Sequence, residues 1–198
     1  MEPAIRRAND LDRTAVLETI SQAFFHDPAW SWVFADEAQR RAQFAEWWQF
    51  AIGAGLRHDS IHVTQSCEAV AIWIPPGFAE FTDEEDVRAE AFLRRACGER
   101  GDEVVEAVAQ FETMHPRDET HWYLSVVATH PEHRGGRLGV GLIEHQLVTI
   151  DDLHLPAYLE SSNAANLARY GELGFEVRDE FHMGDGGPAV TTMWRLAR

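Results

Sequence analysis

The sequence of 198 residues contains no lysine, because all 17 of its basic residues are arginine. This absence excludes catalysis through a lysine Schiff base, and it excludes a phosphate-binding P-loop of the form GxxxxGK[ST]. Positive charge is scarce altogether, since 33 acidic residues leave a formal net charge of −16. Nucleic-acid binding depends on clustered positive charge, so we expect no nucleic-acid partner. An acidic surface instead attracts cationic ligands such as amines, or it serves only to keep the protein soluble.

Cysteine pairs and long apolar runs are also missing. The two cysteines, Cys67 and Cys97, do not form a CxxC motif, which favours free thiols in a reducing compartment. The longest apolar run, AVAIWIPP, is far shorter than the roughly 20 residues needed to cross a bilayer. The charged N-terminus has no secretory signal, so we expect a cytoplasmic protein without a membrane partner. The ten histidines are scattered and lack a Cys or HExxH pattern, so we expect no metal site.

Hydrophobic periodicity predicts one domain over residues 1–198, in which helices alternate with strands around a mixed sheet. In chain order, the expected elements are a strand at 4–6, helices at 9–25 and 36–56, strands at 60–64 and 68–74, two helices within 81–116, a strand at 121–129, a helix at 140–150, a strand at 156–160, a helix at 163–174, and a hairpin of strands at 175–183 and 189–195. Asn9 or Asp10 is expected to cap the first helix, and Pro28 to break it. The 121–129 strand is expected to be buried on both faces, because its apolar residues do not alternate with polar ones.

Two of the helical segments allow more than one interpretation. Phe44, Trp47, Trp48 and Ile52 recur at helical spacing, which is more typical of core packing than of a ligand cage. The acidic segment 81–116 is expected to break near Gly98–Gly101. Its charges form either a solvated face or a lid over a substrate.

A loop rich in glycine and arginine separates the 121–129 strand from the helix that follows. It has the sequence THPEHRGGRLGVGLIEH and contains Arg134, Gly135, Gly136, Arg137, Gly139 and Gly141. The first N–H groups of a helix attract anions, and glycines allow a phosphate to approach the backbone closely. The loop is not a Rossmann fingerprint, because GVG is followed by LIE and the third glycine is missing. We therefore expect it to hold a phosphate-bearing molecule in another way.

This loop and two landmarks after it resemble the GNAT superfamily of acyl-CoA-dependent N-acetyltransferases. The superfamily signature [QR]xxGx[GA] follows a strand that ends in VxVxP. Here Val127–Pro131 precedes Arg134–Gly139. Asn166-x-x-x-Tyr170 and then Gly174-Phe175 match the landmarks farther along the chain.

The resemblance covers nearly the whole chain, although its specific part lies between His121 and Val177. Within the superfamily it is greatest to bacterial enzymes of the puromycin N-acetyltransferase type. The sequence departs from the signature at Arg137, which replaces the central glycine. An arginine there restricts the backbone if the position needs a positive φ, or it supplies a cation to the pyrophosphate or the ribose phosphate.

The resemblance implies an α/β (α+β) fold with a mixed, mostly antiparallel sheet of six or seven strands and helices on both faces. The 121–129 strand should lie away from the sheet edges, with an acceptor-side half at about 1–120 and an acetyl-CoA-binding half at about 121–198. It also implies acetyl transfer from acetyl-CoA, as co-substrate, to a primary amine of a small molecule by direct attack on the thioester. The implied cofactor-binding residues are Val127, Ala128, Thr129, Arg134, Gly135, Gly136, Arg137, Leu138, Gly139, Asn166 and Tyr170.

Candidate catalytic groups follow from the same comparison and from the chemistry of the side chains. The resemblance implies that the strand ending at Thr129 parts from its neighbour, that the Val127 N–H polarises the acetyl carbonyl, and that Tyr170 is the general acid. Glu160, at the end of the 156–160 strand, is the candidate base, or it only orients the amine. His121 is a second candidate for the base, although a single histidine at a strand edge is more often structural.

The acceptor and the assembly are less determined by the sequence. Asp27, Trp32, Trp73 and the acidic segment are candidates for a pocket that holds an aromatic or cationic amine. The alternative to an enzyme is a non-catalytic acyl-CoA-binding or protein-interaction module on the same fold. A homodimer is compatible with either alternative.

Overall fold

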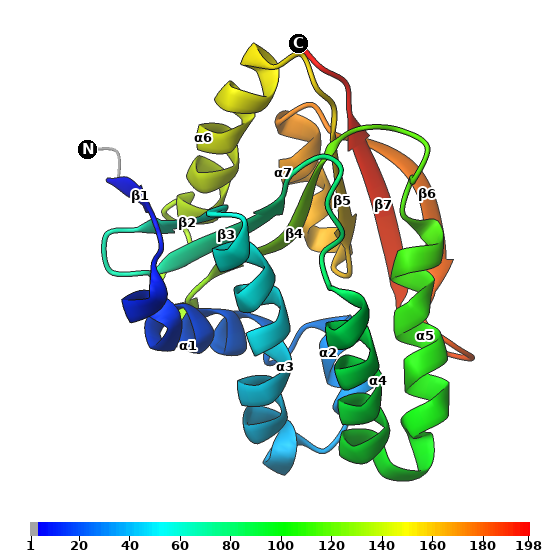
Figure 1. The fold of residues 1–198 in the computed structure, drawn as a ribbon. Coiled ribbons are helices and arrows are strands. Elements are labelled where there is room, and N and C mark those ends of the chain that lie inside the picture. Colours follow the sequence, from blue (N-terminus) through cyan, green and yellow to red (C-terminus); the bar gives the residue numbers. More distant parts are fainter. Residues whose placement is uncertain (1–3) are drawn as a thin grey trace.

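The centre of the fold is a seven-stranded sheet with the strand order β1-β2-β3-β4-β5-β7-β6 (Figure 1). The computed structural model describes residues 4–198. The strands are β1 (Ile5–Arg7), β2 (Ile61–Thr64), β3 (Ala69–Ile74), β4 (Trp122–Thr129), β5 (Ala157–Ser161), β6 (Glu176–His182) and β7 (Ala189–Arg195). Within this range β4 and β5 run parallel, and the other neighbouring pairs are antiparallel. The predicted sheet, with the 121–129 strand in its interior, is confirmed.

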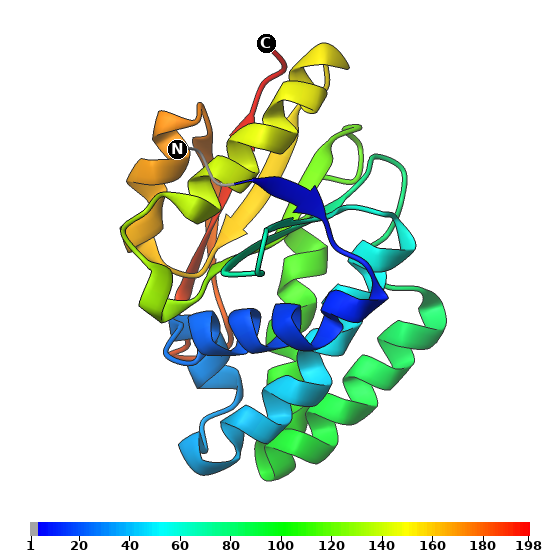
Figure 2. The same cartoon turned by 90° about the vertical axis from the view of Figure 1, so that its left-hand side faces the viewer.

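Helices cover both faces of the sheet and divide the core into two parts (Figures 1 and 2). Those on one face are α1 (Arg13–Phe24), α2 (Pro28–Val33), α3 (Glu37–Arg57), α4 (Asp83–Cys97) and α5 (Gly101–Met114). Those on the other face are α6 (Leu138–Asp152) and α7 (Leu167–Glu172). The first core contains the α3 residues expected to be buried, Phe44, Trp47, Trp48 and Ile52. No helix among residues 4–198 is long and apolar enough to cross a membrane.

The acidic segment forms α4 and α5, which lie side by side (Figure 1). Together they bury one apolar stripe, made of Ala89, Phe92, Leu93, Val104 and Ala107. Their charged residues lie mainly on the outside, so most of this segment is a solvated face. The end of α5 nevertheless reaches a cavity that is described below.

The segment that begins at Pro28 is a helix, which was not predicted. Helix α1 ends at Phe24, before the proline. Asp27 then accepts hydrogen bonds from the N–H groups of Ala29 (3.0 Å) and Trp30 (3.3 Å). Proline suits the first position of a helix, because it has no N–H that needs an acceptor. The proline that stops one helix therefore starts the next, α2.

Strand β4 is not buried on both faces, contrary to the prediction. Its buried residues, Leu124, Val126 and Ala128, alternate with residues of intermediate exposure. Adjacent residues of β3 pair with Leu124 and Val126, which leaves Ser125 between them as a β-bulge. The pairing with β5 stops at Leu124, so the second half of β4 has lost its neighbour on that side. This loss of a neighbour exposes part of the strand beyond Leu124.

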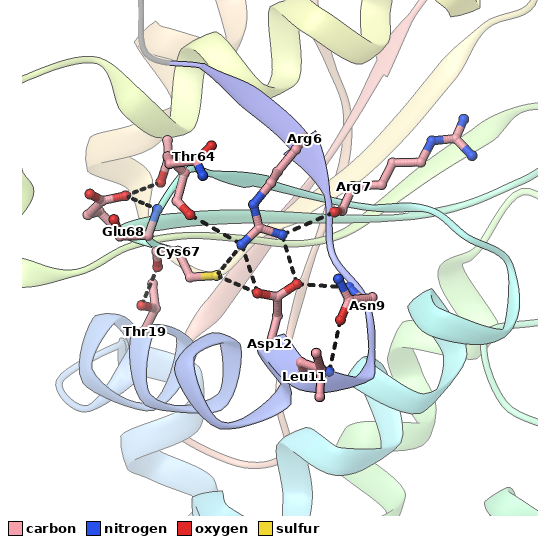
Figure 3. A network of polar contacts seen from close by, with 11 residues as sticks. Arg6, Arg7, Asn9, Leu11, Asp12, Thr19, Thr64, Cys67 and Glu68 are labelled. Carbon is pink, nitrogen blue, oxygen red and sulfur yellow. Dashed lines mark hydrogen bonds and ion pairs between the residues drawn. The ribbon is translucent and has the colours of Figure 1, made fainter.

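A network of polar contacts joins the first strand to the turn between β2 and β3 (Figure 3). Arg6 donates hydrogen bonds to Asp12 at 2.8 and 2.7 Å, and it lies 3.8 Å from the sulfur of Cys67. The bonds from Arg6, and one from the N–H of Asn9, lower the pKa of Asp12 to about 2. Asn9 also accepts a hydrogen bond from the Leu11 N–H at 2.9 Å and so caps the 3₁₀ turn before α1, as predicted. Both cysteines are free thiols.

Candidate active site

Strands β4 and β5 pair only at their first three residues and then part, which opens a gap in the sheet. The direction of the β4 N–H groups follows from one hydrogen bond, donated by His130 to the Glu68 oxygen at 2.8 Å. Because N–H groups alternate along an antiparallel ladder, those of Val127 and Thr129 point away from β3 and into the gap. The N–H of Ala128, between them, points toward β3. The predicted parting of the strands is confirmed, and backbone donors line it.

The glycine-rich loop leads from β4 into the N-terminus of α6. The Gly141 N–H is the first to bond back along the helix, to the Arg137 oxygen at 2.9 Å, so residues 138–140 present N–H groups without a helical acceptor. A Cβ atom at Gly139 would lie 2.9 Å from Thr129 Oγ1, so this glycine allows α6 to approach β4. A Cβ atom at Gly136 would meet nothing closer than 3.8 Å, so the spacing of the helix does not require glycine there.

The loop fits a polyphosphate anion. The free N–H groups and the helix dipole of α6 favour negative charge at this end of the helix. Arg134 adds a guanidinium, which donates to the Ala23 oxygen at 3.1 Å and thereby lies beside the end of α1. Gly135 has φ 93°, a backbone conformation that a side chain would strain.

Arg137 occupies the position where the GNAT signature has its central glycine, and its backbone is left-handed, with φ 54° and ψ 20°. The position therefore does need a positive φ, at a cost of roughly 1–2 kcal/mol for a residue with a side chain. The exposed guanidinium lies 3.4 Å from Glu144 on α6 and 3.5 Å from Glu172 on α7. It thus links the two helices on this face of the sheet.

Tyr170 lies on α7 and is buried, with 8% of its surface exposed. Burial raises the pKa of its hydroxyl to about 12, and the negative charge of Asp27 adds to the rise. The hydroxyl therefore stays protonated at neutral pH. Asp27 in turn accepts a hydrogen bond from Ser162, just after β5, at 2.7 Å. This bond joins α2 of the first half of the chain to the end of β5 in the second.

The helix expected over 163–174 is divided in two. Asn163 accepts a hydrogen bond from the Ala165 N–H at 3.0 Å and caps a 3₁₀ turn, and α7 begins only after Asn166. The side chain of Asn166 accepts a hydrogen bond from Arg169 at 2.8 Å. Gly174, with φ 91°, follows the helix in a left-handed conformation that favours glycine.

Glu160 lies on the opposite face of the sheet from Tyr170, in the wall of a cavity of about 420 Å³. The loop after β3, the end of α5 and the start of β4 complete this cavity. Burial raises the pKa of Glu160 to about 8, the Tyr123 hydroxyl opposes the rise, and the charge of Glu80 adds to it. Neither Glu160 Oε1 nor the Tyr158 hydroxyl has a hydrogen-bond partner among residues 4–198.

Glu80 is a second carboxylate in the same cavity, and no sequence motif marks it. Ser125, at the bulge of β4, donates a hydrogen bond to its side chain. Burial raises the pKa of Glu80 to about 7, and the bond from Ser125 opposes the rise. The only signal in the sequence is the Pro75-Pro76-Gly77 stop, which predicts a loop at the end of β3 without saying which of its side chains points inward.

His121 reaches the cavity together with His115, which the sequence analysis did not single out. Their Nε2 atoms are 3.0 Å apart, and His121 Nδ1 lies 2.5 Å from the Glu119 oxygen. Burial, with the charge of His121, lowers the pKa of His115 to about 4, and burial also lowers that of His121. Both rings are therefore mainly neutral at pH 7, and His121 remains a second candidate for the base.

Two of the aromatic residues expected near the acceptor lie elsewhere. Trp73 is fully buried in the core beneath α6, on the same face of β3 as Ala69 and Ala71, so its prediction is wrong. Trp32 packs under the Arg100 guanidinium at 4.5 Å and does not line the described cavity.

Comparison with known proteins agrees with this geometry. A family model described as the acetyltransferase (GNAT) family matches residues 58–175. A solved structure described as histone acetyltransferase HPA2 and related acetyltransferase, from Corynebacterium glutamicum, is 24% identical, with 100% of this chain and 98% of that one covered and a TM-score of 0.69. Arylalkylamine N-acetyltransferase 2 from Aedes aegypti is 11% identical, with 98% and 99% covered and a TM-score of 0.65. The Drosophila melanogaster polyamine N-acetyltransferase that forms N-acetylagmatine is 11% identical, with 98% and 100% covered and a TM-score of 0.63.

At these identities the solved structures show a shared fold. The family model covers more than half of the chain, and on that basis the protein belongs to the acetyltransferase (GNAT) family.

Proposed function

We propose that this protein transfers the acetyl group of acetyl-CoA to a primary amine of a small molecule, by direct attack of the amine on the thioester. The observation that carries the proposal is the gap between β4 and β5. Val127 and Thr129 direct N–H groups into it, Tyr170 lies on one face of the sheet, and Glu160 lies on the other. An acid and a base on either side of one opening suit a reaction in which a proton leaves the amine and another reaches a thiolate.

The loop and α6 would hold the co-substrate. Arg134, Arg137 and the free N–H groups of residues 138–140 suit its phosphates, and Gly139 lets the helix lie close to β4. Acetyl-CoA would supply the activated acetyl group. The N–H groups of Val127 and Thr129 suit its pantetheine arm, and that of Val127 stabilises negative charge as it develops on the acetyl oxygen.

The two catalytic side chains move protons in opposite directions. Glu160 takes a proton from the ammonium, and its raised pKa of about 8 is closer to that of an alkylamine than that of an ordinary glutamate. Tyr170 gives a proton to the departing thiolate, whose pKa of about 8.5 lies well below the tyrosine value of about 12. The transfer therefore relies on the position of Tyr170 rather than on its acidity.

The acceptor is a cationic amine on this proposal. A net charge of −16 and two carboxylates in one cavity support it. Two structural neighbours are named for acting on arylalkylamines and polyamines. The resemblance of residues 155–177 to puromycin N-acetyltransferases adds aminonucleosides to the candidates. Two free thiols are consistent with a reducing, cytoplasmic location.

A thiol-release assay tests the proposal. Purified protein is incubated with acetyl-CoA and a panel of amines: polyamines, arylalkylamines, aminoglycosides, aminonucleosides, amino acids and peptides. We expect free thiol to appear with at least one cationic amine and the acetylated amine to be detected by mass. Binding of acetyl-CoA without turnover across the panel would instead favour the non-catalytic module.

A further inference from the structure

Two carboxyl groups lie at the inner end of the cavity on the α5 face. Glu80 and Glu160 come from different elements and line the same space. Among the described lining residues, the arginine Arg117 is paired with Glu112 and so does not neutralise them. Glu160 Oε1 is buried and has no hydrogen-bond partner within residues 4–198. Leaving a buried carboxyl oxygen without a hydrogen-bond donor is costly, so this end of the cavity suits a cationic donor, such as an ammonium, that comes from outside the chain.

Glu80 is held in place by several contacts rather than being a loose surface residue. Its side chain accepts the hydrogen bond from Ser125. Arg57 donates to its backbone oxygen at 3.0 Å and forms two hydrogen bonds of 2.9 Å with Glu85. Glu85 and Thr82 form the capping box of α4, which ties the loop to that helix. The backbone and the carboxylate of Glu80 are therefore both fixed before any ligand arrives.

One part of the cavity wall is apolar. Ile74, Phe78 and Phe111 contribute hydrocarbon surface to it. Phe78 is 61% exposed, which is unusual for a phenylalanine, and its ring lies 4.6 Å from that of His58. An exposed aromatic residue at the edge of a cavity is suited to contact with an apolar ligand.

From this arrangement we infer that the cavity takes an amphiphilic primary amine without an acid group, and that Glu80 is the residue that selects its positive charge. The ammonium lies between Glu80 and Glu160, and the apolar body lies toward Phe78 and Phe111. An amino acid is rejected because its carboxylate would meet two others. The inference rests on the proposed function for the reaction itself and adds the class of acceptor. When Glu160 takes the proton from the ammonium, Glu80 remains to hold the amine end.

Calorimetry without acetyl-CoA tests this inference, with three probes of one shape: 2-phenylethylamine, 2-phenylethanol and phenylalanine. We expect the protein to bind the amine about tenfold or more tightly than the alcohol or the amino acid. In Glu80→Gln the affinity for the amine should fall about tenfold or more, while that for the alcohol stays unchanged. Glutamine keeps an oxygen acceptor for Ser125, so the cavity should keep its shape.

Glu84→Gln is the matched control, because Glu84 is exposed on α4 and undergoes the same change of charge. It should bind all three probes as the unmodified protein does. Ser125→Ala keeps the Glu80 carboxyl but removes the hydrogen bond that holds it. The affinity for the amine should therefore fall by a smaller factor than in Glu80→Gln, about two- to fivefold.

Several outcomes would overturn the inference. They are equal affinity of the unmodified protein for amine and alcohol, no binding of either, and an amine affinity that Glu80→Gln leaves unchanged. The proposed function fails separately, because binding is measured without co-substrate. A protein that selects the amine through Glu80 but never releases thiol from acetyl-CoA would contradict the proposed function alone. If the unmodified protein and Glu80→Gln both release thiol with the same KM for the amine, the inference alone would be contradicted.

Discussion

The two sides of the β4–β5 gap are built in different ways. On the α6 side, one short segment presents backbone N–H groups, and Gly139 sets its distance from β4. On the α5 side, side chains from separate segments meet in a cavity, among them Glu80, Tyr123 and Glu160. A site made of backbone depends on local conformation, whereas a site made of side chains depends on the whole fold. The first can therefore be found from a motif, and the second cannot.

The two proposed proton carriers differ in how burial affects them. Burial raises the pKa of both Tyr170 and Glu160, to about 12 and about 8. For Tyr170 this keeps the proton that an acid has to give. Glu160, in contrast, is mainly protonated at pH 7 when no ligand neutralises the cavity, so it needs the cation of the substrate or a higher pH to act as a base. Burial thus keeps both groups protonated, which makes Tyr170 a weaker acid and leaves Glu160 without the charge that a base needs.

The largest expected effect is that of Tyr170→Phe. The ring and its packing remain while the proton source is lost, so kcat should fall by roughly 10²–10⁴-fold. Acetyl-CoA affinity, measured by calorimetry, should change little. Tyr158→Phe is the matched control, because it removes a hydroxyl on the other face of the sheet, and its kcat should stay within about tenfold of the unmodified enzyme. Full turnover by Tyr170→Phe would show that the thiolate needs no acid from the protein.

Glu160→Gln should have a smaller effect that depends on pH. With Glu160 as base, the rate of the unmodified enzyme rises with pH up to its pKa of about 8 and then levels off. The variant has to rely on the neutral fraction of the amine, which continues to rise until about pH 10. The ratio of the two rates should therefore be constant below about pH 8 and shrink above it. A ratio that stays the same from pH 6 to pH 10 would leave Glu160 an orienting role only.

Thermal unfolding checks the pKa of Glu160 independently of activity. Its folded pKa, about 8, lies above the unfolded value of about 4.5, so the protonated carboxyl is the form that the fold favours. The stability linked to this group is fully present below pH 4.5 and is lost as the pH rises through 8. Near pH 5, Glu160→Gln should have the same free energy of unfolding as the unmodified protein. At pH 9 the variant should be more stable by roughly 2–4 kcal/mol and so unfold at a higher temperature.

The sequence predicted the α6 side of the gap better than the α5 side, because the α6 side is one local segment and the α5 side combines side chains from separate segments. Local signals predicted the mixed sheet, the buried aromatic residues of α3 and the loop before α6. They missed the Ser125 bulge, because a bulge arises from pairing between strands and not from a local pattern. They missed Glu80 because an acidic residue in a loop has no periodicity to indicate where its side chain points.

Gly139→Ala tests whether the α6 side depends on close contact between backbones. The new Cβ would lie 2.9 Å from Thr129 Oγ1 and 3.4 Å from Val127 Cγ2, so α6 has to move away from β4. We expect thermal unfolding to show a loss of about 1–2 kcal/mol in stability. Calorimetry should show a loss of about tenfold in acetyl-CoA affinity. Gly171→Ala on α7 is the control: its Cβ meets nothing within 4 Å, and it should stabilise the protein by about 0.5–1 kcal/mol. Unchanged affinity in Gly139→Ala would mean that the helix position is not set by this contact.

The smallest effects are expected at Arg137, where backbone and side chain can be separated within one residue. Arg137→Gly removes a strained left-handed backbone, with φ 54°, and also removes exposed ion pairs with Glu144 and Glu172. Such ion pairs contribute little, so the variant should be about 0.5–1 kcal/mol more stable. It should nevertheless bind acetyl-CoA about two- to fivefold less tightly, and the loss should shrink at high salt, because a cation near the phosphates is gone.

Arg137→Ala removes the same charge but keeps a Cβ in the strained conformation. Its affinity for acetyl-CoA should equal that of Arg137→Gly, while its stability should be lower by about 1 kcal/mol. A glycine variant that binds acetyl-CoA more tightly than the unmodified protein would contradict this division, because the arginine would then hinder the loop instead of supplying a charge. If Arg137→Ala and Arg137→Gly bind acetyl-CoA equally but differ in stability, the Arg137 side chain contributes charge to binding, and the backbone conformation at this position affects stability alone.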